Sequence, residues 1–367
     1  MSYLPALTDP HIVINWNSGV GIHHDGLTIP RQHTNLNLEN TIEIVPAYDP
    51  GLINTVTLEE LESCLPIAVC APLNGRFLPS AWFRSSVATS KFPYPFVRVI
   101  KEKQQWVLDG NHPLSAFEIH GIMMRGGDIN SLLRHEIIET TKTGPGMQAP
   151  WNQSPAANYI DYPFSRNDET PDNHFYAQPR FVHHIDDKAI QLTRNFYSDI
   201  LPVNSYVLDL MSSWVSHIKP SRSDLTVTGL GMNPDELKAN DRLKNFIVQD
   251  LNIYPSLPFS DAQFDAVICT VSIEYLRRPL EIFREVARVL TERGLFVNIL
   301  SERCFPTKTI TIWNQLYPFE RLGLILDFYR HSNQFIEIET FSVRELALDN
   351  ASNRDPWYAI VARKQNI

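Results

Sequence analysis

Chemically reactive side chains follow an apolar run near the middle of the chain. The run "YVLDL", residues 206–210, is typical of a buried strand and carries one carboxylate, Asp209. The next four residues offer a thioether, two hydroxyls and an indole donor: Met211, Ser212, Ser213 and Trp214. Ligands of an open α/β sheet collect at the carboxyl ends of its strands. The sequence therefore predicts that these residues form the floor of a small-molecule pocket.

Two interpretations of this stretch stay open. In the first, Asp209 ends a strand that is buried on both faces, and the hydroxyls of Ser212 and Ser213 donate to its carboxylate. In the second, the chain turns into a helix after residue 210, Ser212 or Ser213 caps that helix, and Trp214 packs against the sheet. The first predicts a ligand site and the second a purely structural role.

Three titratable side chains near the expected strand ends are candidates for proton transfer: His217, Glu274 and Tyr275. Two pairs of adjacent histidines, His23-His24 and His183-His184, raise the question of a metal site. Adjacent side chains diverge in a strand or a helix, so each pair supplies at most one ligand. Since no His or Cys spacing completes a site, we expect no metal.

Length and charge limit the possible functions. The 367 residues suffice for two domains, and the formal net charge of −9 makes a nucleic acid an unfavourable partner. No apolar run reaches the ~18 residues that a membrane-spanning helix needs, and the first residues do not resemble a signal peptide. The four cysteines lack metal-type spacing and fit reduced thiols. We expect a cytoplasmic protein that binds neither nucleic acid nor membrane.

Composition divides the chain into three parts. Residues 1–140 hold short runs of branched and aromatic residues, which predict an antiparallel, β-rich domain. Residues 141–175 are dense in turn formers and predict a linker or an ordered arm whose aromatic residues pack against another element. Residues 176–367 alternate strand and helix patterns, which predicts a doubly wound α/β domain. The expected N-terminal strands are 11–16, 41–48, 65–73, 96–102, 104–110 and 117–124.

The elements of the last part can be assigned from periodicity. Helices are expected over 186–201 and over 279–294, where Gly294 ends the second one. Strands are expected over 206–210, 225–231, 264–271 and 295–300.

Residues 257–300 closely resemble class I S-adenosylmethionine-dependent methyltransferases of type 11. The matching residues are Leu257-Pro258-Phe259, Phe264-Asp265, Pro279, Glu285, Arg288-Val289-Leu290 and Gly294. The resemblance extends over about 176–345 and implies a Rossmann-like fold with S-adenosylmethionine as cofactor. In that family the first strand ends in Asp and a glycine-rich loop. The second strand ends in an acid that binds ribose, and a further acidic residue lies near the adenine.

The chain matches this cofactor pattern in part. Asp209 and Gln249-Asp250-Leu251 fit it, whereas Met211, Ser213 and Val215 replace glycines and Gly231 replaces the acid. We therefore expect weak or altered cofactor binding, which Gly231→Asp, or glycine at all three loop positions, should tighten. The residues that the resemblance implies for the cofactor are Asp209, Met211, Ser212, Ser213, Trp214, Gly231, Met232, Asp250, Leu251 and Thr270.

The segment "PRFVHHIDDKAI", residues 179–190, stands where such methyltransferases often have a lid. Arg180, His183, His184 and Asp186 are candidates to line the pocket, whereas Asp186-Asp187 equally suits a helix cap.

A second resemblance covers about residues 38–125. "WVLDGNHPLSAFEIHGIMM", residues 106–124, is similar to the terminal hairpin of prolyl isomerases of the FK506-binding-protein, SlyD type, and Tyr48 matches an aromatic pocket position. The helix that closes the isomerase pocket has no counterpart, so we expect little isomerase activity. The Asp109-Gly110 turn is equally explained by backbone geometry.

The leading hypothesis is a methyltransferase-like protein that acts on a small or peptide substrate. The alternative is a non-catalytic scaffold whose N-terminal domain binds polypeptide segments.

Overall fold

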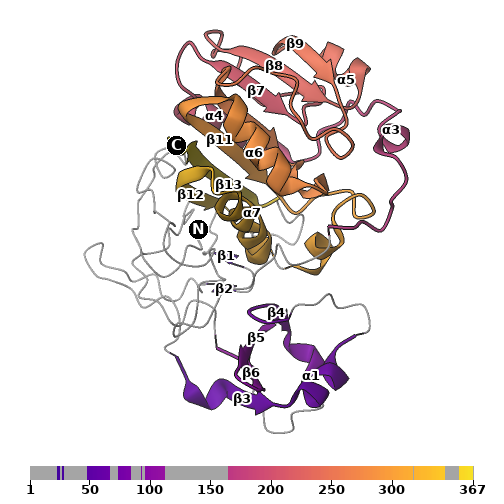
Figure 1. Cartoon of the computed structure of the whole chain (residues 1–367), viewed down its shortest axis with the longest axis vertical. Helices are drawn as coiled ribbons and strands as arrows, with labels where there is room; N and C mark the ends of the chain where they lie inside the picture. The colour runs from indigo at the N-terminus through magenta and orange to yellow at the C-terminus, as the bar shows by residue number, and fades with distance from the viewer. Residues whose placement is uncertain are drawn as a thin grey trace, which may run out of the picture.

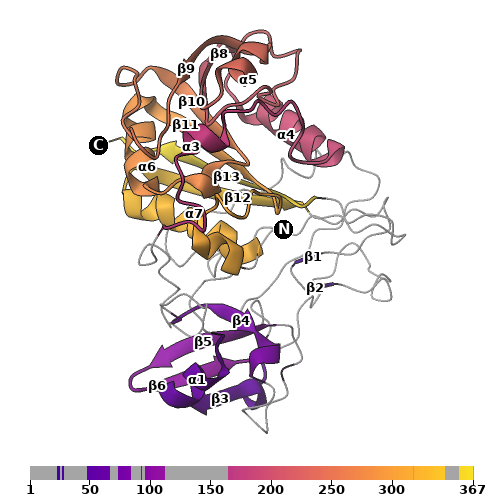
Figure 2. The ribbon, with the colours of Figure 1, turned by 90° about the vertical axis from the view of Figure 1, so that its right-hand side faces the viewer.

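The computed structural model describes residues 23–24, 27–28, 48–66, 73–83, 92, 96–111, 164–316, 318–343 and 355–366. These parts contain two larger sheets, one with seven strands in the C-terminal half and one with four strands in the N-terminal half. Figure 1 shows the two sheets apart from each other. The turned view in Figure 2 separates the same two sheets.

The seven-stranded sheet has the order β12-β13-β11-β10-β7-β8-β9. Five neighbouring strands are parallel, and β13 runs antiparallel to both of its neighbours. The chain moves outward from β7 through β8 to β9 and then returns to place β10 on the other side of β7. The strands are β7 (Tyr206–Leu210), β8 (Thr226–Gly231), β9 (Leu243–Val248), β10 (Phe264–Thr270), β11 (Leu290–Leu300), β12 (Phe335–Val343) and β13 (Trp357–Lys364). This is a Rossmann-like, mixed sheet with a topological switch point between β7 and β10.

Helices cover both faces of this sheet. On one face α6 (Pro279–Val289) and α7 (Pro318–Ser332) bury Phe283 and Phe328 against β7, β10 and β11. On the other face α4 (Asp187–Ile200) buries Phe196 against Trp357. The shorter helices are α3 (Asp172–Phe175), α5 (Pro234–Ala239), and the 3-10 turns η7 (Ile273–Tyr275) and η8 (Thr311–Gln315). The central strands of the sheet are therefore buried on both faces, as the alternating pattern predicted.

The connection from β7 to β8 contradicts one expectation. Residues 211–225 contain no helix, so neither Ser212 nor Ser213 caps one. The backbone of Ser212 instead crosses the end of the neighbouring strand, and its amide donates to the carbonyl of Leu230 (2.8 Å). An irregular loop thus connects two adjacent parallel strands, a place where helices are usual.

The end of α6 was also predicted wrongly. The helix ends at Val289, five residues before Gly294, because Leu290 already pairs with Phe264 of β10. Leu295 pairs with Ala266, so four residues bulge out between these two pairs and Arg293 takes a left-handed φ of 58°. Gly294 belongs to this bulge, where a Cβ would lie 3.0 Å from the carbonyl oxygen of Thr291.

The four-stranded sheet has the antiparallel order β3-β6-β5-β4. The strands β5 (Phe96–Glu102) and β6 (Gln105–Asp109) confirm two expected runs, whereas β3 (Ile53–Val56), β4 (Phe77–Pro79) and α1 (Leu58–Cys64) were not predicted. The expected strands 11–16 and 117–124 lie outside the described residues, as does most of 41–48 and 65–73. The strands β1 (His23–His24) and β2 (Leu27–Thr28) form a separate pair. The N-terminal half also contains the 3-10 turns η2 (Pro50–Leu52) and η3 (Ser80–Trp82).

The Asp-Gly turn of the N-terminal half has the structural role that its geometry suggested. Asp109 Oδ1 accepts from the amide of Asn111 (2.9 Å), and Asn111 Nδ2 donates to the carbonyl of Asp49 (3.0 Å). A Cβ on Gly110 would meet the Phe92 ring at 2.6 Å, so this position needs glycine.

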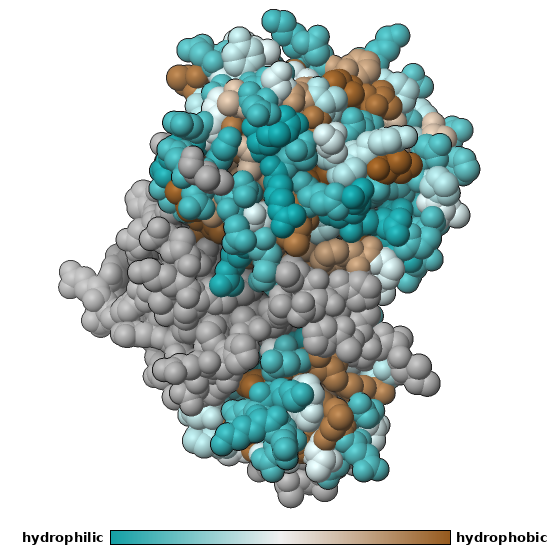
Figure 3. All heavy atoms as spheres, in the orientation of Figure 1, coloured by the Kyte–Doolittle hydropathy of each residue, from teal (hydrophilic) through white to brown (hydrophobic). Residues whose placement is uncertain are grey.

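One face of the described C-terminal half is mostly polar. Figure 3 shows polar and charged residues over most of the described C-terminal half, with hydrophobic residues scattered between them. None of the helices in the described ranges is both long and apolar enough to cross a membrane.

Candidate functional site

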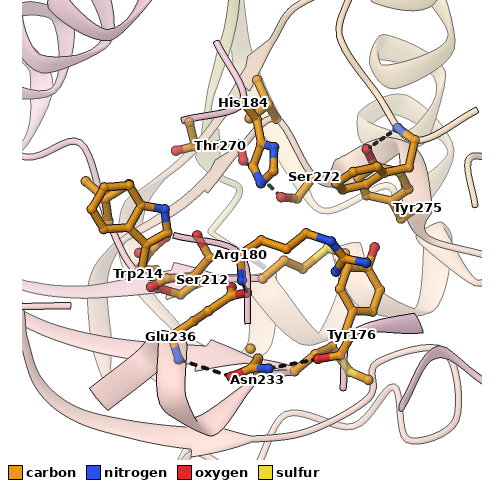
Figure 4. Close-up of a pocket in the computed structure, with 18 of the residues that line it drawn as sticks. Tyr176, Arg180, His184, Ser212, Trp214, Asn233, Glu236, Thr270, Ser272 and Tyr275 are labelled. Atoms are coloured by element: carbon orange, nitrogen blue, oxygen red, sulfur yellow. Dashed lines mark hydrogen bonds between the residues drawn. The ribbon is translucent and has the colours of Figure 1, made fainter. Parts of the chain in front are cut away.

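A cavity of about 300 Å³ lies at the carboxyl ends of β7, β8, β9 and β10. This volume is at the lower end of the range typical of small-molecule sites, and the position is the switch point of the sheet. Figure 4 shows side chains from the strand ends and from residues 176–184 pointing into it. All ten residues that the sequence nominated for the cofactor line this one cavity. Of the three titratable candidates His217 and Tyr275 line it, whereas Glu274 does not.

The floor of the cavity depends on a close backbone crossing at Gly231. A Cβ on Gly231 would lie 2.1 Å from the carbonyl oxygen of Ser212, a distance that no side chain can adopt. The expectation that Gly231→Asp restores a ribose contact is therefore wrong in its geometry. The glycine is needed because the loop after β7 lies directly against the end of β8.

Three residues around the cavity have left-handed backbone angles without being glycine. They are Met211 (φ 58°), His217 (φ 52°) and Val271 (φ 44°). Such conformations cost about 1–3 kcal/mol each and gather at ligand sites. Ser213 and Val215 also line the cavity, but of the three predicted glycine positions only Met211 has the left-handed angle.

Asp209 is fully enclosed at the end of β7. Ser212 Oγ donates to its Oδ2 (2.6 Å), as predicted, and the second hydroxyl is that of Ser216 and not of Ser213. Burial raises the pKa of Asp209 to about 6, and these two hydroxyls oppose the rise. Asn240 Nδ2 holds Ser216 Oγ in place (2.9 Å).

His217 and Trp214 connect the loop to the residues that cover it. The Trp214 indole donates to the carbonyl of Val182 (3.1 Å) and stacks on His183, so it does not pack on the sheet. Burial lowers the pKa of His217 to about 4, and its Nδ1 has no partner among the described atoms. The imidazole is therefore neutral near pH 7 and offers one unpaired nitrogen.

Tyr275 and Glu274 follow β10 in the 3-10 turn η7. The amide of Phe305 donates to the Tyr275 hydroxyl (2.9 Å), which ties this turn to the loop after β11. Glu274 is buried away from the cavity, and burial raises the pKa of its carboxyl to about 7. Thr270, at the end of β10, shares a hydrogen bond with the Tyr197 hydroxyl (2.7 Å).

Residues 172–184 roof the cavity and are fixed to α5. Asn233 caps α5 and donates from Nδ2 to the carbonyl of Tyr176 (2.8 Å), while Glu236 Oε1 accepts from the amide of Arg180 (2.6 Å). Figure 4 shows both contacts beneath the Arg180 side chain. Arg180, His183 and His184 line the cavity as expected, whereas Asp186 caps α4 by accepting from Ala189 N (2.8 Å).

A buried ion cluster holds the other end of the roof. Lys308 has no exposed side-chain surface and lies 3.3 Å from carboxylate oxygens of both Asp168 and Asp172. Asp172 also pairs with Arg166 (2.9 Å) and accepts from Asn252 Nδ2 (2.9 Å). Because Asp172 and Asn252 both line the cavity, this cluster connects the roof to the end of β9.

Several cavity residues were not predicted from sequence. These are Asp172, Tyr176, Asn233, Glu236, Asn252, Arg303, Cys304 and Phe305. The "NPDE" stretch carried a helix-start signal at Asn233, but nothing local indicates that Glu236 turns toward a ligand site. Within the described ranges no group of three or more His, Cys, Asp or Glu side chains is arranged to hold a metal ion.

Comparison with protein families finds a match over residues 212–298 to the family described as Methyltransferase domain, of type 11. The matched range runs from the loop after β7 to β11 and includes most of the cavity floor. Residues 212–298 of the C-terminal half are therefore similar to methyltransferase domains, as the sequence resemblance predicted. Comparison with the curated proteins finds no match.

Three of the similar solved structures, described as methyltransferases, share 12–15% identical residues with this chain. A Haloferax volcanii methyltransferase in complex with the Trm112 activator has a TM-score of 0.35, with 50% of this chain and 90% of that one covered. A Thermotoga maritima methyltransferase has a TM-score of 0.37, covering 48% and 89%. Haemonchus contortus phosphoethanolamine N-methyltransferase 2 in complex with S-adenosyl-L-methionine has a TM-score of 0.35, with 49% of this chain and 53% of that one covered.

The crossing at Gly231 predicts a large stability loss on adding a side chain. We expect Gly231→Ala and Gly231→Asp to lower the free energy of unfolding by about 1–3 kcal/mol or more, because backbone must move. Urea denaturation measures this loss. Gly51→Ala is the control, since there a Cβ meets only the movable side chain of Asp49 (3.0 Å). Equal stability of the Gly231 and Gly51 variants would contradict the crossing.

The left-handed angle at Met211 predicts that glycine is better tolerated there than alanine. Both variants lose the same thioether packing, but only Met211→Gly relieves the strained φ, so it should be more stable by about 0.5–1 kcal/mol. Ser213→Gly and Ser213→Ala form the control pair, since Ser213 has no left-handed φ. If Met211→Ala is the more stable of its pair in urea denaturation, position 211 is not strained.

The raised pKa of Asp209 predicts how the stability of the protein changes with pH. Its folded-state pKa, about 6, exceeds the unfolded value near 3.8, so its contribution to stability is fully present below about pH 4 and is lost as pH rises through about 6. Asp209→Asn should therefore gain stability relative to the natural protein by up to roughly 3 kcal/mol between about pH 4 and pH 7. Denaturation at several pH values measures this gain, and exposed Asp235→Asn is the control. If the stability difference between Asp209→Asn and the natural protein stays constant across this pH range, the pKa of Asp209 is not shifted.

Proposed function

We propose that this protein is a methyltransferase that binds S-adenosylmethionine in the cavity at the ends of β7 to β10 and methylates a small or peptide substrate. The observation that carries the proposal is that all ten nominated cofactor residues line one cavity, and eight of them lie within the range that matches the methyltransferase domain. The finer parts of the proposal are the identity of the cofactor and a mode of binding altered from the glycine-loop pattern.

The lining chemistry fits the parts of this cofactor. Asp250 and Leu251 follow β9 and suit the adenine, and the Trp214 and Tyr275 rings suit a cationic sulfonium. Glu236 would supply the carboxylate for the ribose hydroxyls in place of Gly231, since it lines the cavity from the first turn of α5. Burial raises the pKa of Glu236, and a hydrogen-bonding diol would compensate for that burial.

The cofactor would supply an electrophilic methyl group, and the protein's own residues would position the acceptor and exclude water. The roof formed by residues 172–184 covers the cavity through its contacts with Asn233 and Glu236. Methyl transfer in such a site depends mainly on orientation of the two reactants. His217 also lines the cavity, but burial lowers its pKa to about 4, so its neutral imidazole would be a weak base for the proton of the acceptor.

Altered cofactor binding follows from the loop after β7. Met211 keeps its side chain where the family pattern has glycine, and the tight crossing at Gly231 excludes an acid at the end of β8. We therefore propose a ribose contact through α5 and a smaller loop contact than in glycine-loop relatives.

The charge of Glu236 provides the test. Glu236→Gln keeps an oxygen for the Arg180 amide but loses the charge, so S-adenosylhomocysteine should bind about tenfold or more weakly in calorimetric titration. Asp235→Asn removes the neighbouring, exposed carboxylate of the same helical turn and should leave binding unchanged. Equal affinities of the two variants would refute the role of Glu236. No binding to the natural protein at millimolar ligand would refute the cofactor.

The alternative is a non-catalytic binding protein built on the same domain. Strained Met211 and Val271, and the lack of a helix after β7, favour it as departures from a regular cofactor loop. Binding of S-adenosylhomocysteine without methyl transfer to any acceptor would support this alternative.

The likeness of the N-terminal half to FK506-binding proteins of the SlyD type also remains a proposal, as does the cytoplasmic location. The antiparallel order β3-β6-β5-β4 is compatible with the former. Most of the quoted hairpin, from His112 to Met124, lies outside the described residues. A polypeptide-binding role for this half, with little isomerase activity, is retained on the sequence alone.

A further inference from the structure

Arg180 crosses the cavity and ends among aromatic rings. Its guanidinium carbon lies 4.5 Å from the centre of the Phe175 ring, 5.3 Å from that of Phe305 and 5.8 Å from that of Tyr176. One hydrogen bond joins its Nη2 to the carbonyl of Phe175 (2.8 Å). Figure 4 shows the extended side chain passing over Glu236 and Asn233 toward the Tyr176 ring. The guanidinium is thus fixed in position by neutral groups.

Arg180 forms no salt bridge within the described part of the chain, in contrast to Arg303 and Asp172, which also line the cavity. Arg303, the second lining arginine, pairs with Asp355 (2.7 Å). Asp172 pairs with Arg166 and Lys308. Glu236 accepts the backbone amide of Arg180 and not its guanidinium. A partly buried cation with no carboxylate in salt-bridge contact is costly, and an anion that pairs with it directly recovers that cost.

The guanidinium lies at one end of the cavity, and this end suits the substrate and not the cofactor. Phe305 follows β11, and its amide donates to the hydroxyl of Tyr275, which follows β10. The loop residues 211–215 and Gly231 follow β7 and β8, which lie further along the sheet. A ligand group beside Phe305 therefore lies over β10 and β11, away from the crossing at Gly231.

We infer that the substrate carries an anionic group, a carboxylate or a phosphate, that pairs with the guanidinium of Arg180 beside the rings of Tyr176 and Phe305. This inference rests on the proposed function, since it concerns the substrate of the same site. A planar guanidinium stacked on a ring keeps its in-plane N–H groups available for a bidentate contact with such an anion. The adjacent rings favour an aromatic or apolar body next to the charge.

His184 provides a neighbouring reporter of this charge. Its ring lies 5.3 Å from that of Phe305, and burial lowers its pKa, with the charge of Arg180 as the second cause. An anion on Arg180 cancels that second cause. The pKa of His184 should therefore rise when an anion binds, and it should rise in the same direction in Arg180→Met.

The experiment compares three probes that share a phenyl ring: benzoate, phenyl phosphate and neutral benzamide. Each is titrated into the full-length protein, with and without S-adenosylhomocysteine. We expect an anion to bind at least tenfold more tightly than benzamide, and Arg180→Met to remove this preference. Arg180→Lys, which keeps the charge but not the fork, should retain part of it. Arg303→Met is the matched variant, because its guanidinium is already paired, and it should retain most of the preference.

The probes also distinguish the two anion sources. Tighter benzoate indicates a carboxylate substrate, and tighter phenyl phosphate indicates a phosphate. Equal binding of the anions and benzamide, or a preference that survives Arg180→Met, overturns the inference. A preference lost equally in Arg303→Met overturns it too, because the effect would then be the summed charge of the cavity.

Cofactor binding is measured separately in Arg180→Met. S-adenosylhomocysteine and 5′-methylthioadenosine, which lacks the amino-acid part, should both bind as they do to the natural protein. If Arg180→Met weakens the binding of S-adenosylhomocysteine but not that of 5′-methylthioadenosine, Arg180 contacts the carboxylate of the cofactor. This result would overturn the substrate assignment. If S-adenosylhomocysteine never binds but benzoate or phenyl phosphate still prefers Arg180, the proposed function fails while the anion site stands.

Discussion

The contact between the backbone of Ser212 and the end of β8 constrains the whole floor of the cavity. The amide of Ser212 donates to Leu230, and its carbonyl oxygen occupies the space of a side chain at Gly231. To reach this position directly from β7, the chain takes a left-handed turn at Met211. The same turn brings the Ser212 hydroxyl onto the carboxylate of Asp209. One crossing therefore fixes the glycine, the strain and the hydrogen bond of the buried acid together.

The roof depends on contacts that are remote in sequence. Asp172 and Asn252 are 80 residues apart, and Lys308 reaches Thr170 across 138 residues. A fully buried lysine and the buried carboxylate of Asp172 are costly to desolvate and persist only where their partners are well placed. Here the partners are the ends of the segment that covers the cavity. The ion cluster at one end and the cap of α5 at the other thus set the position of Arg180 relative to the strand ends.

The sequence predicted the elements whose signals are local. The apolar runs gave β7, β8 and β10, and Asp186 was rightly considered as a cap. The end of α6 was missed because Leu290 is taken by pairing with Phe264, a tertiary contact that overrides helix propensity. Gly231 was read as a lost acid, since nothing local reveals that a carbonyl 19 residues earlier fills its side-chain space. Glu236 and the residues that fix the roof were missed for the same reason.

The charges of the cavity are separated along the sheet in a way that suits two ligands of opposite charge. Buried or half-buried carboxyls lie on the β7 to β9 side, and burial raises the pKa of each of them: Asp209, Glu236 and Asp250. The guanidinium of Arg180 lies beside Phe305, over β10 and β11. The proposed sulfonium cofactor on the first side would favour the ionised carboxyls, and the proposed anionic substrate on the second side would pair with the guanidinium. Each ligand also neutralises the charge that the other brings, so the two should bind more tightly together than separately. The strained and incompletely paired groups of the free protein are, on this account, the groups that a ligand pair would satisfy.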